Sequence, residues 1–188
     1  MKQVMKVFLT LSIGIIASQS YGQQKKEKVK TIEYETIVDV TPQKAWEVLA
    51  NYVNVGEFHG GVQSSHIIGN KAQGVGGDRF CQIDKKVSVK ERITTWEEGE
   101  YYIYEVYEWE NFPLKRMYNS FGVKVNDEGK TVIYSTINYK LTNWFMEMMA
   151  KGKLKKSARD GILWYKDYME TGVKNRNLKE LRKKYKNA

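Results

Sequence analysis

Hydrophobic and polar residues alternate along most of the chain between residues 31 and 140, which is the pattern of half-buried β-strands. In the first stretch, residues 31–40, Ile32, Tyr34 and Val38 share one face, while acidic residues occupy the other. Short clusters rich in Gly, Asn and Asp separate the later stretches and are typical of tight turns. The pattern predicts seven strands, at residues 31–40, 62–69, 78–83, 87–96, 101–109, 114–125 and 131–140.

Two segments depart from this alternation. After the first strand, Thr41 and Pro42 offer an N-cap residue and a proline suited to the first helical position. Apolar residues at helical spacing follow to about residue 51, and residues 52–59 predict a second short helix. From Thr142 the apolar spacing becomes three and four, so one helix of about 30 residues is predicted to end near Gly172.

These elements predict an α+β domain with a cavity. Consecutive hairpins make an antiparallel sheet, which can pack one face while the other meets water. A single long helix cannot contact a curved sheet everywhere, so a space remains between them. We therefore expect a curved antiparallel sheet of about seven strands wrapped on a long C-terminal helix, with one or two short helices after the first strand.

The first residues have the pattern of a secretory signal. Two lysines precede an apolar run at residues 7–17, which is shorter than the roughly 20 residues that span a bilayer. Ser20 and Gly22 supply small residues for cleavage before Gln23. We expect a signal peptide at 1–22, a linker at 23–30, a domain at 31–172 and a basic extension at 173–188, in a periplasmic or secreted protein. An uncleaved membrane anchor is the alternative.

Composition narrows the function classes. The lone Cys81 cannot form an intramolecular disulfide, and its place in an alternating strand favours a small buried residue over a nucleophile. The net charge is +9, and the basic excess lies mostly after Lys151. Because no nucleic-acid motif accompanies it, we interpret the excess as a solvated helix face. Peripheral contact of the basic C-terminal helix with an anionic membrane stays a hypothesis, and a monomer or weak dimer is expected.

Five short motifs accompany this order of elements, at residues 38–49, 74–79, 89–93, 104–106 and 160–163. Their order and spacing resemble the START-like (SRPBCC) superfamily, in the branch that groups polyketide cyclases and dehydrases with lipid-transfer and Bet v 1-like proteins. The resemblance covers residues 31 to about 172 and implies a helix-grip fold with a pocket for a small hydrophobic molecule. It does not fix a reaction, because members range from cyclases to carriers.

Arg79 and Glu91 are the strongest polar candidates. Each shares a predicted strand face with apolar residues, and a buried charge requires a partner. Adjacent strands would bring the two together, either as a structural ion pair or as a ligand-binding or acid–base site.

His59, which precedes a Gly60-Gly61 pair, is a candidate general base, with loop scaffolding as the alternative. Two histidines and one cysteine give no zinc signature, so no metal is expected. No cofactor is expected either, because the glycines at 74–77 lack the spacing of a nucleotide-binding loop.

Tyrosines recur on successive predicted strands at Tyr104, Tyr118 and Tyr134. We expect them to line the cavity as ligand-binding residues or to form plain core. Trp144, Met148 and Met149 are expected to pack the long helix onto the sheet, and Trp144 is also a candidate ligand contact.

The leading hypothesis is an exported, non-enzymatic binding or transfer protein for a small hydrophobic or amphipathic molecule. The rival is a cyclase- or dehydratase-like enzyme that uses His59, Arg79 and Glu91 in the same cavity. A third class is an interaction module whose basic helix docks on an anionic surface.

Overall fold

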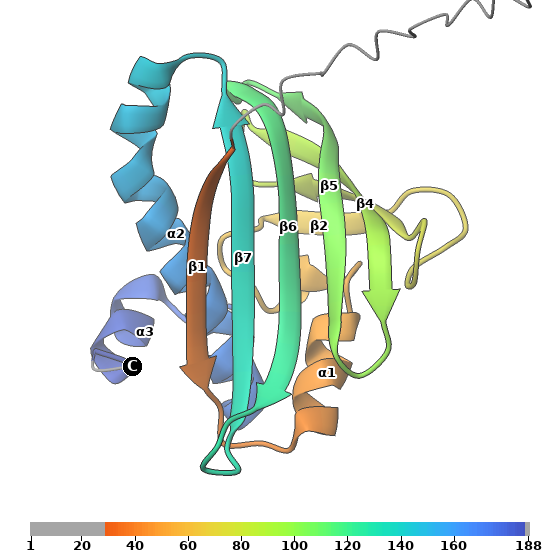
Figure 1. The fold of residues 1–188 in the computed structure, drawn as a ribbon, viewed down its shortest axis with the longest axis vertical. Coiled ribbons are helices and arrows are strands. Elements are labelled where there is room, and N and C mark those ends of the chain that lie inside the picture. The colour runs from red at the N-terminus through yellow and green to blue at the C-terminus, as the bar shows by residue number, and fades with distance from the viewer. Residues whose placement is uncertain (1–28, 187–188) are drawn as a thin grey trace, which may run out of the picture.

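Seven strands form one antiparallel sheet in the order β1-β7-β6-β5-β4-β3-β2, so the first and last strands of the chain pair. The computed structural model describes residues 29–186 (Figure 1), and the predicted signal peptide lies outside them. The elements are β1 (Lys30–Ile37), α1 (Pro42–Ala50), the 3-10 helix η1 (Val55–Glu57), β2 (Ser64–Ile67), β3 (Asp78–Gln82), β4 (Ser88–Glu97), β5 (Tyr101–Glu110), β6 (Leu114–Val125), β7 (Thr131–Leu141), α2 (Trp144–Thr171) and α3 (Leu178–Lys184).

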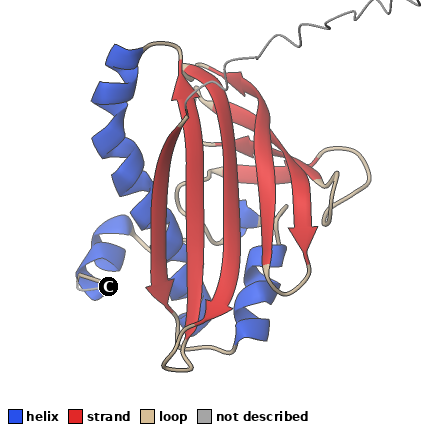
Figure 2. Ribbon diagram, in the orientation of Figure 1, coloured by secondary structure: helices blue, strands red, loops and turns tan. Residues whose placement is uncertain are grey.

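The helices lie on one side of the curved sheet, and the face toward the viewer in Figure 2 carries none. Strand and long-helix positions agree with those that the alternation predicts, so the α+β helix-grip architecture is confirmed. The second short helix is reduced to η1. The Ser65 hydroxyl accepts from the Gly56 N–H and donates to the Val53 carbonyl, which ties this segment to β2 instead.

α1 closes one end of the sheet. The Thr41 hydroxyl accepts a hydrogen bond from the Lys44 N–H, so the predicted N-cap is present and Pro42 follows it. The helix buries Trp46, whose indole N–H donates to Glu98 at 2.7 Å and whose ring meets Trp96 edge-on. Aromatic side chains of neighbouring elements continue this packing inward: Tyr52, Phe58, Tyr102 and Tyr165.

α2 packs tightly only along its second half. Its N-cap Asn143 accepts from the Met146 N–H, and its last turn ends at Gly172, which has the left-handed φ of 69° that glycine adopts without strain. Ile162 and Leu163 are fully buried.

The first turns of α2 are exposed, so the expectation that Trp144, Met148 and Met149 pack on the sheet is wrong. A different stripe of the helix faces the protein there, formed by Met146, Glu147, Ala150 and Leu154. Helical spacing of apolar residues predicts the helix but does not say which of two apolar stripes meets the sheet.

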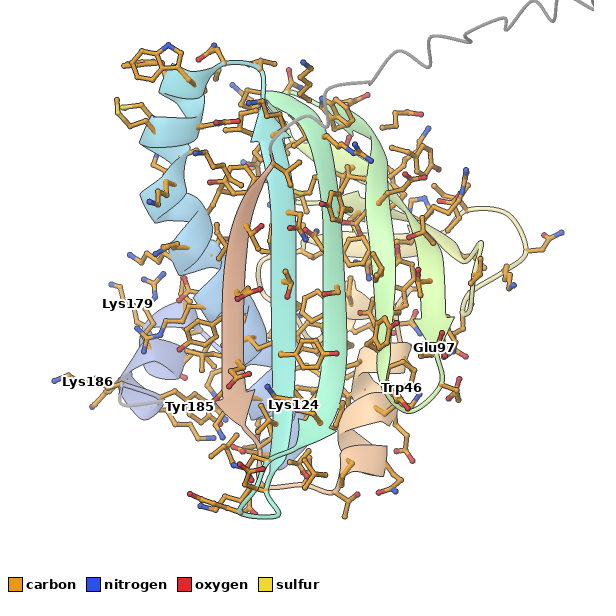
Figure 3. All side chains as sticks on the ribbon, viewed as in Figure 1. Trp46, Glu97, Lys124, Lys179, Tyr185 and Lys186 are labelled. Carbon is orange, nitrogen blue, oxygen red and sulfur yellow. The ribbon has the colours of Figure 1, made fainter. Side chains whose placement is uncertain are left out.

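The basic C-terminal residues fold back as α3 rather than extending α2. Leu181 is fully buried, and the buried Asp167 accepts hydrogen bonds from Arg176, Lys184 and Tyr185 at 2.6, 2.7 and 3.0 Å. Burial alone would raise the pKa of Asp167, but these donors outweigh it and hold the pKa below its usual value. Tyr185 lies against the domain, whereas Lys179 projects from it (Figure 3).

We predict that Asp167→Ala lowers the free energy of unfolding by about 3 kcal/mol, because it leaves partly buried cations without their acceptor. The wild-type stabilisation should be complete above about pH 4, the pKa of an unfolded aspartate, and should be lost as pH falls through the lower folded pKa. Urea denaturation at several pH values measures both. Glu180→Gln is the control, because Glu180 also faces Arg176 but is exposed, and a change above about 0.5 kcal/mol is not expected there.

Candidate ligand-binding site

A pocket of about 200 Å³ lies between the concave face of the sheet and α2. It lies next to the aromatic side chains that pack near α1. Strands, the loop after η1 and the middle of α2 all contribute to its walls: Val55, His59, Gly61, Val62, Arg79, Cys81, Ile83, Glu91, Tyr104, Phe121, Ser135, Ile137, Ser157, Ala158, Gly161 and Tyr165.

A buried ion pair forms part of the pocket wall. Arg79 of β3 and Glu91 of β4 are direct cross-strand partners, and Arg79 Nε donates to Glu91 Oε2 at 2.6 Å. The two residues are only 4% and 7% exposed. The sequence-based expectation that adjacent strands bring them together is therefore met, and both side chains contact the cavity.

Further contacts hold the guanidinium of Arg79. It donates to the Tyr52 carbonyl, and its carbon lies 3.8 Å from the centre of the Tyr52 ring and 5.2 Å from that of Tyr104. Burial would lower the pKa of Arg79, but Glu91, together with Cys81, Tyr52 and Tyr104, outweighs burial and keeps the pKa above its usual value. The pair thus places a fixed positive charge and its counter-charge at the cavity wall.

Cys81 is a buried thiol next to this pair. Its Sγ lies 3.6 Å from Glu91 Oε2, as a weak donor. Burial raises the pKa of Cys81 to about 12, so the thiolate needed for nucleophilic attack is scarce at neutral pH.

His59 lines the pocket from the loop after η1. Its Nδ1 accepts a hydrogen bond from the Gly61 N–H at 3.2 Å, so the neutral ring carries its proton on Nε2. The ring packs against Trp164 and Tyr165, and a Cβ at Gly161 would lie 3.0 Å from Nε2. A glycine inside α2 therefore allows the imidazole to approach the helix. Burial lowers the pKa of His59 to about 4, and the ring is neutral at pH 7.

Among residues 29–186, five buried side-chain atoms lack a hydrogen-bond partner: Tyr52 Oη, Tyr102 Oη, Asn119 Oδ1, Ser135 Oγ and Arg159 Nε. Ser135 Oγ of β7 lines the pocket, is 3% exposed as a residue, and forms no hydrogen bond with any of residues 29–186. Asn119 donates to the Tyr104 hydroxyl at 3.1 Å, while its own Oδ1 has no partner within the same described range. Buried polar groups in folded proteins are nearly always hydrogen-bonded, so a water or ligand at these positions would satisfy them.

The structure does not gather the three predicted tyrosines. Tyr104 lines the pocket, but Tyr118 and Tyr134 lie on the outer face of the sheet, where Arg116 covers Tyr118 and Lys124 covers Tyr134. Lys124 projects from the uncovered face in Figure 3. Successive strand residues point to opposite faces, and these two tyrosines occupy outward-facing positions of β6 and β7.

Trp144 lies away from this pocket as well. It is 72% exposed and borders a separate groove between the start of β1 and the start of α2. The expected Trp144 contact with a ligand in the main cavity is therefore corrected.

Sequence reasoning missed Ser135 and Asn119. A signal was present, because Ser135 lies on the same strand face as Ile133 and Ile137. A polar residue on an otherwise apolar face is a candidate for binding. Gly161 and Ala158 gave no comparable signal, since small residues in a helix do not reveal which surface they meet. Within residues 29–186, no group of three or more His, Cys, Asp or Glu side chains is placed to hold a metal ion.

The family described as "Polyketide cyclase / dehydrase and lipid transport" matches residues 30–170. The chain belongs to this family. Membership confirms the resemblance seen in the sequence motifs, and it associates the fold with hydrophobic-ligand binding while leaving the ligand of this member open. A comparison with curated proteins finds no match.

Solved structures share the fold at low identity. The protein XoxI from Bacillus cereus is 15% identical with a TM-score of 0.58, covering 75% of this chain and 94% of its own. Ara h 8.0201 is 16% identical with a TM-score of 0.55, at 76% and 98% coverage. A protein from Thermobifida fusca is 13% identical with a TM-score of 0.64, at 74% and 92% coverage. These similarities show the architecture and carry no function across.

We predict that Glu91→Ala lowers the free energy of unfolding by about 3–5 kcal/mol, because Arg79 is left buried without a counter-charge. The double variant Arg79→Met/Glu91→Leu should recover more than half of that loss, since apolar replacement of both partners removes the uncompensated charge. Urea denaturation compares the variants.

The control is Glu35→Ala, which breaks the exposed pair with Lys124 and should cost less than about 1 kcal/mol. A double variant as unstable as Glu91→Ala would show that the pair does not act as a unit.

Proposed function

We propose that this family member binds a small amphipathic molecule in the pocket between the sheet and α2. The observation that carries the proposal is the unfilled pocket in which Ser135 Oγ lacks a protein partner beside the Arg79–Glu91 pair. Apolar side chains of Val62, Ile83 and Ile137 supply the remaining wall. Such a mixture of apolar lining and a few convergent polar groups is typical of small-molecule sites.

The size of the pocket restricts the ligand. A volume of about 200 Å³ is below the roughly 300–1,000 Å³ typical of sites for drug-sized molecules. It is close to the space of roughly seven water molecules at about 30 Å³ each. We infer that a small ring or polar head enters the pocket, with a hydroxyl or carbonyl near Ser135, and that any longer apolar part extends past the exposed Ser157 at the rim.

Export is part of this proposal and rests on the sequence pattern of residues 1–22. Native mass spectrometry of protein purified from an exporting host should detect a retained small molecule. The intact mass in the same experiment should correspond to a chain that begins at Gln23, and a full-length mass would instead favour a retained anchor.

We predict that Ser157→Trp reduces ligand retention about tenfold or more, because an indole at the rim obstructs a pocket of this size. Gly152→Trp is the matched control. It adds the same ring to the same helix at an exposed position where a Cβ meets nothing within 4 Å, and it leaves the net charge unchanged. Equal retention by both variants would contradict binding in this pocket.

A cyclase- or dehydratase-like enzyme is the second candidate, favoured by one observation. His59 and Glu91 line the same pocket, and the neutral imidazole, whose Nδ1 accepts from the Gly61 N–H, keeps an Nε2–H that can donate a hydrogen bond to a developing oxyanion. Incubation of the retained molecule with fresh protein discriminates between the two functions. If the protein is an enzyme, the mass or spectrum of the retained molecule changes with wild type and not with His59→Gln. A carrier leaves the molecule unaltered with either protein.

A further inference from the structure

The first two turns of α2 present four large apolar side chains to solvent. Trp144, Phe145, Met148 and Met149 are 72%, 54%, 58% and 65% exposed, and we call them the apolar tip. Nine large hydrophobic residues are exposed among residues 29–186, and these four are the ones that cluster on consecutive turns. Contiguous exposed apolar surface of this kind marks an interaction site more often than chance scatter does.

The charge around the apolar tip has one sign. The next turns of α2 expose Lys151, Lys153, Lys155 and Lys156. Glu147 is the one acidic residue between Trp144 and Ser157, and it is buried, where it accepts from the Leu141 N–H and pairs with Lys140. The partner that complements this surface is therefore apolar at the tip and anionic beside it.

The apolar tip also lies where the chain enters the domain. Trp144 and Met148 border a groove of about 400 Å³ together with Lys30 and Ile32 of β1. β1 begins at the same end of the molecule as α2 (Figure 1).

We propose that the apolar tip and the four lysines form a docking surface for a bilayer that contains anionic phospholipid. Trp144 and Phe145 would enter the headgroup region, where aromatic rings are favoured, and the lysines would face lipid phosphates. A second copy of the chain fits less well, because self-association through the tip would bring the exposed lysines of both copies together. No helix within residues 29–186 is long and apolar enough to cross a membrane, and docking requires none.

Sedimentation of the chain that begins at Gln23 with vesicles tests the proposal. Wild type should bind vesicles of phosphatidylcholine mixed with phosphatidylglycerol more tightly than phosphatidylcholine alone, and salt should weaken this binding. Trp144→Ser/Phe145→Ser should lower the affinity at least about tenfold, since two exposed aromatics no longer bury apolar surface. The matched control Val75→Ser/Val125→Ser removes two exposed apolar residues elsewhere and should bind as wild type.

A second variant removes the charge alone. Replacing Lys151, Lys153, Lys155 and Lys156 with glutamine should abolish the preference for phosphatidylglycerol and leave weak binding to both vesicles. Equal binding of wild type and Trp144→Ser/Phe145→Ser would overturn the proposal, because the apolar tip would then contribute nothing to binding. A concentration-dependent dimer that this double variant abolishes, without vesicle binding, would assign the tip to a second copy.

The docking proposal and the pocket proposal can each be disproved without the other. Trp144→Ser/Phe145→Ser should leave retention of the small molecule unchanged, so loss of docking does not remove the pocket. Ser157 lies 13 residues after Trp144 on α2, roughly 20 Å along the helix, so docking would set the pocket rim within reach of the membrane surface.

Discussion

A curved sheet and a straight helix can touch along only part of their length, and the remaining features of this domain follow from that constraint. The second half of α2 meets the sheet and the aromatic side chains near α1, where Ile162, Leu163 and Tyr165 are buried. Its first half borders a groove with the start of β1 and with Tyr139 of β7. The pocket lies beside the middle of α2, and the exposed apolar tip lies at the start of the helix. One mismatch of shape thus accounts for both the cavity and the unpartnered helix end.

The aromatic packing decides how much of that space stays open. Tyr52, Phe58 and Tyr102 fill the part near α1, so the hollow that remains is small and partly polar. What remains is bordered by the Arg79–Glu91 pair, whose charges are balanced by each other and by the Tyr52 carbonyl. A compensated pair of this kind adds little net stability. It makes one wall of the pocket polar, which favours a ligand with a polar head over a plain hydrocarbon.

Most of the fold could be read from the sequence, because strand alternation, the Thr41 cap and the glycine at 172 are local signals. Arg79 lies two residues from Cys81, and Glu91 two residues from Val89, so each charged residue shares a strand face with an apolar one. This placed the ion pair on the inner face. The same rule, applied to Tyr134 against Ile133, would have placed that tyrosine outside. What local patterns could not supply was the choice between two apolar stripes on α2 and the extent of aromatic filling. Both depend on where the helix crosses the sheet.

Ligand binding requires the pocket beside Ser135 to be open, and a high-resolution crystal structure of protein purified without denaturation tests this most directly. We expect ordered electron density for a ligand or water within hydrogen-bonding distance of Ser135 Oγ, between the sheet and Gly161. A structure in which Phe121, Ile137 and Tyr165 close the gap, with the Ser135 hydroxyl bonded to protein, would contradict it.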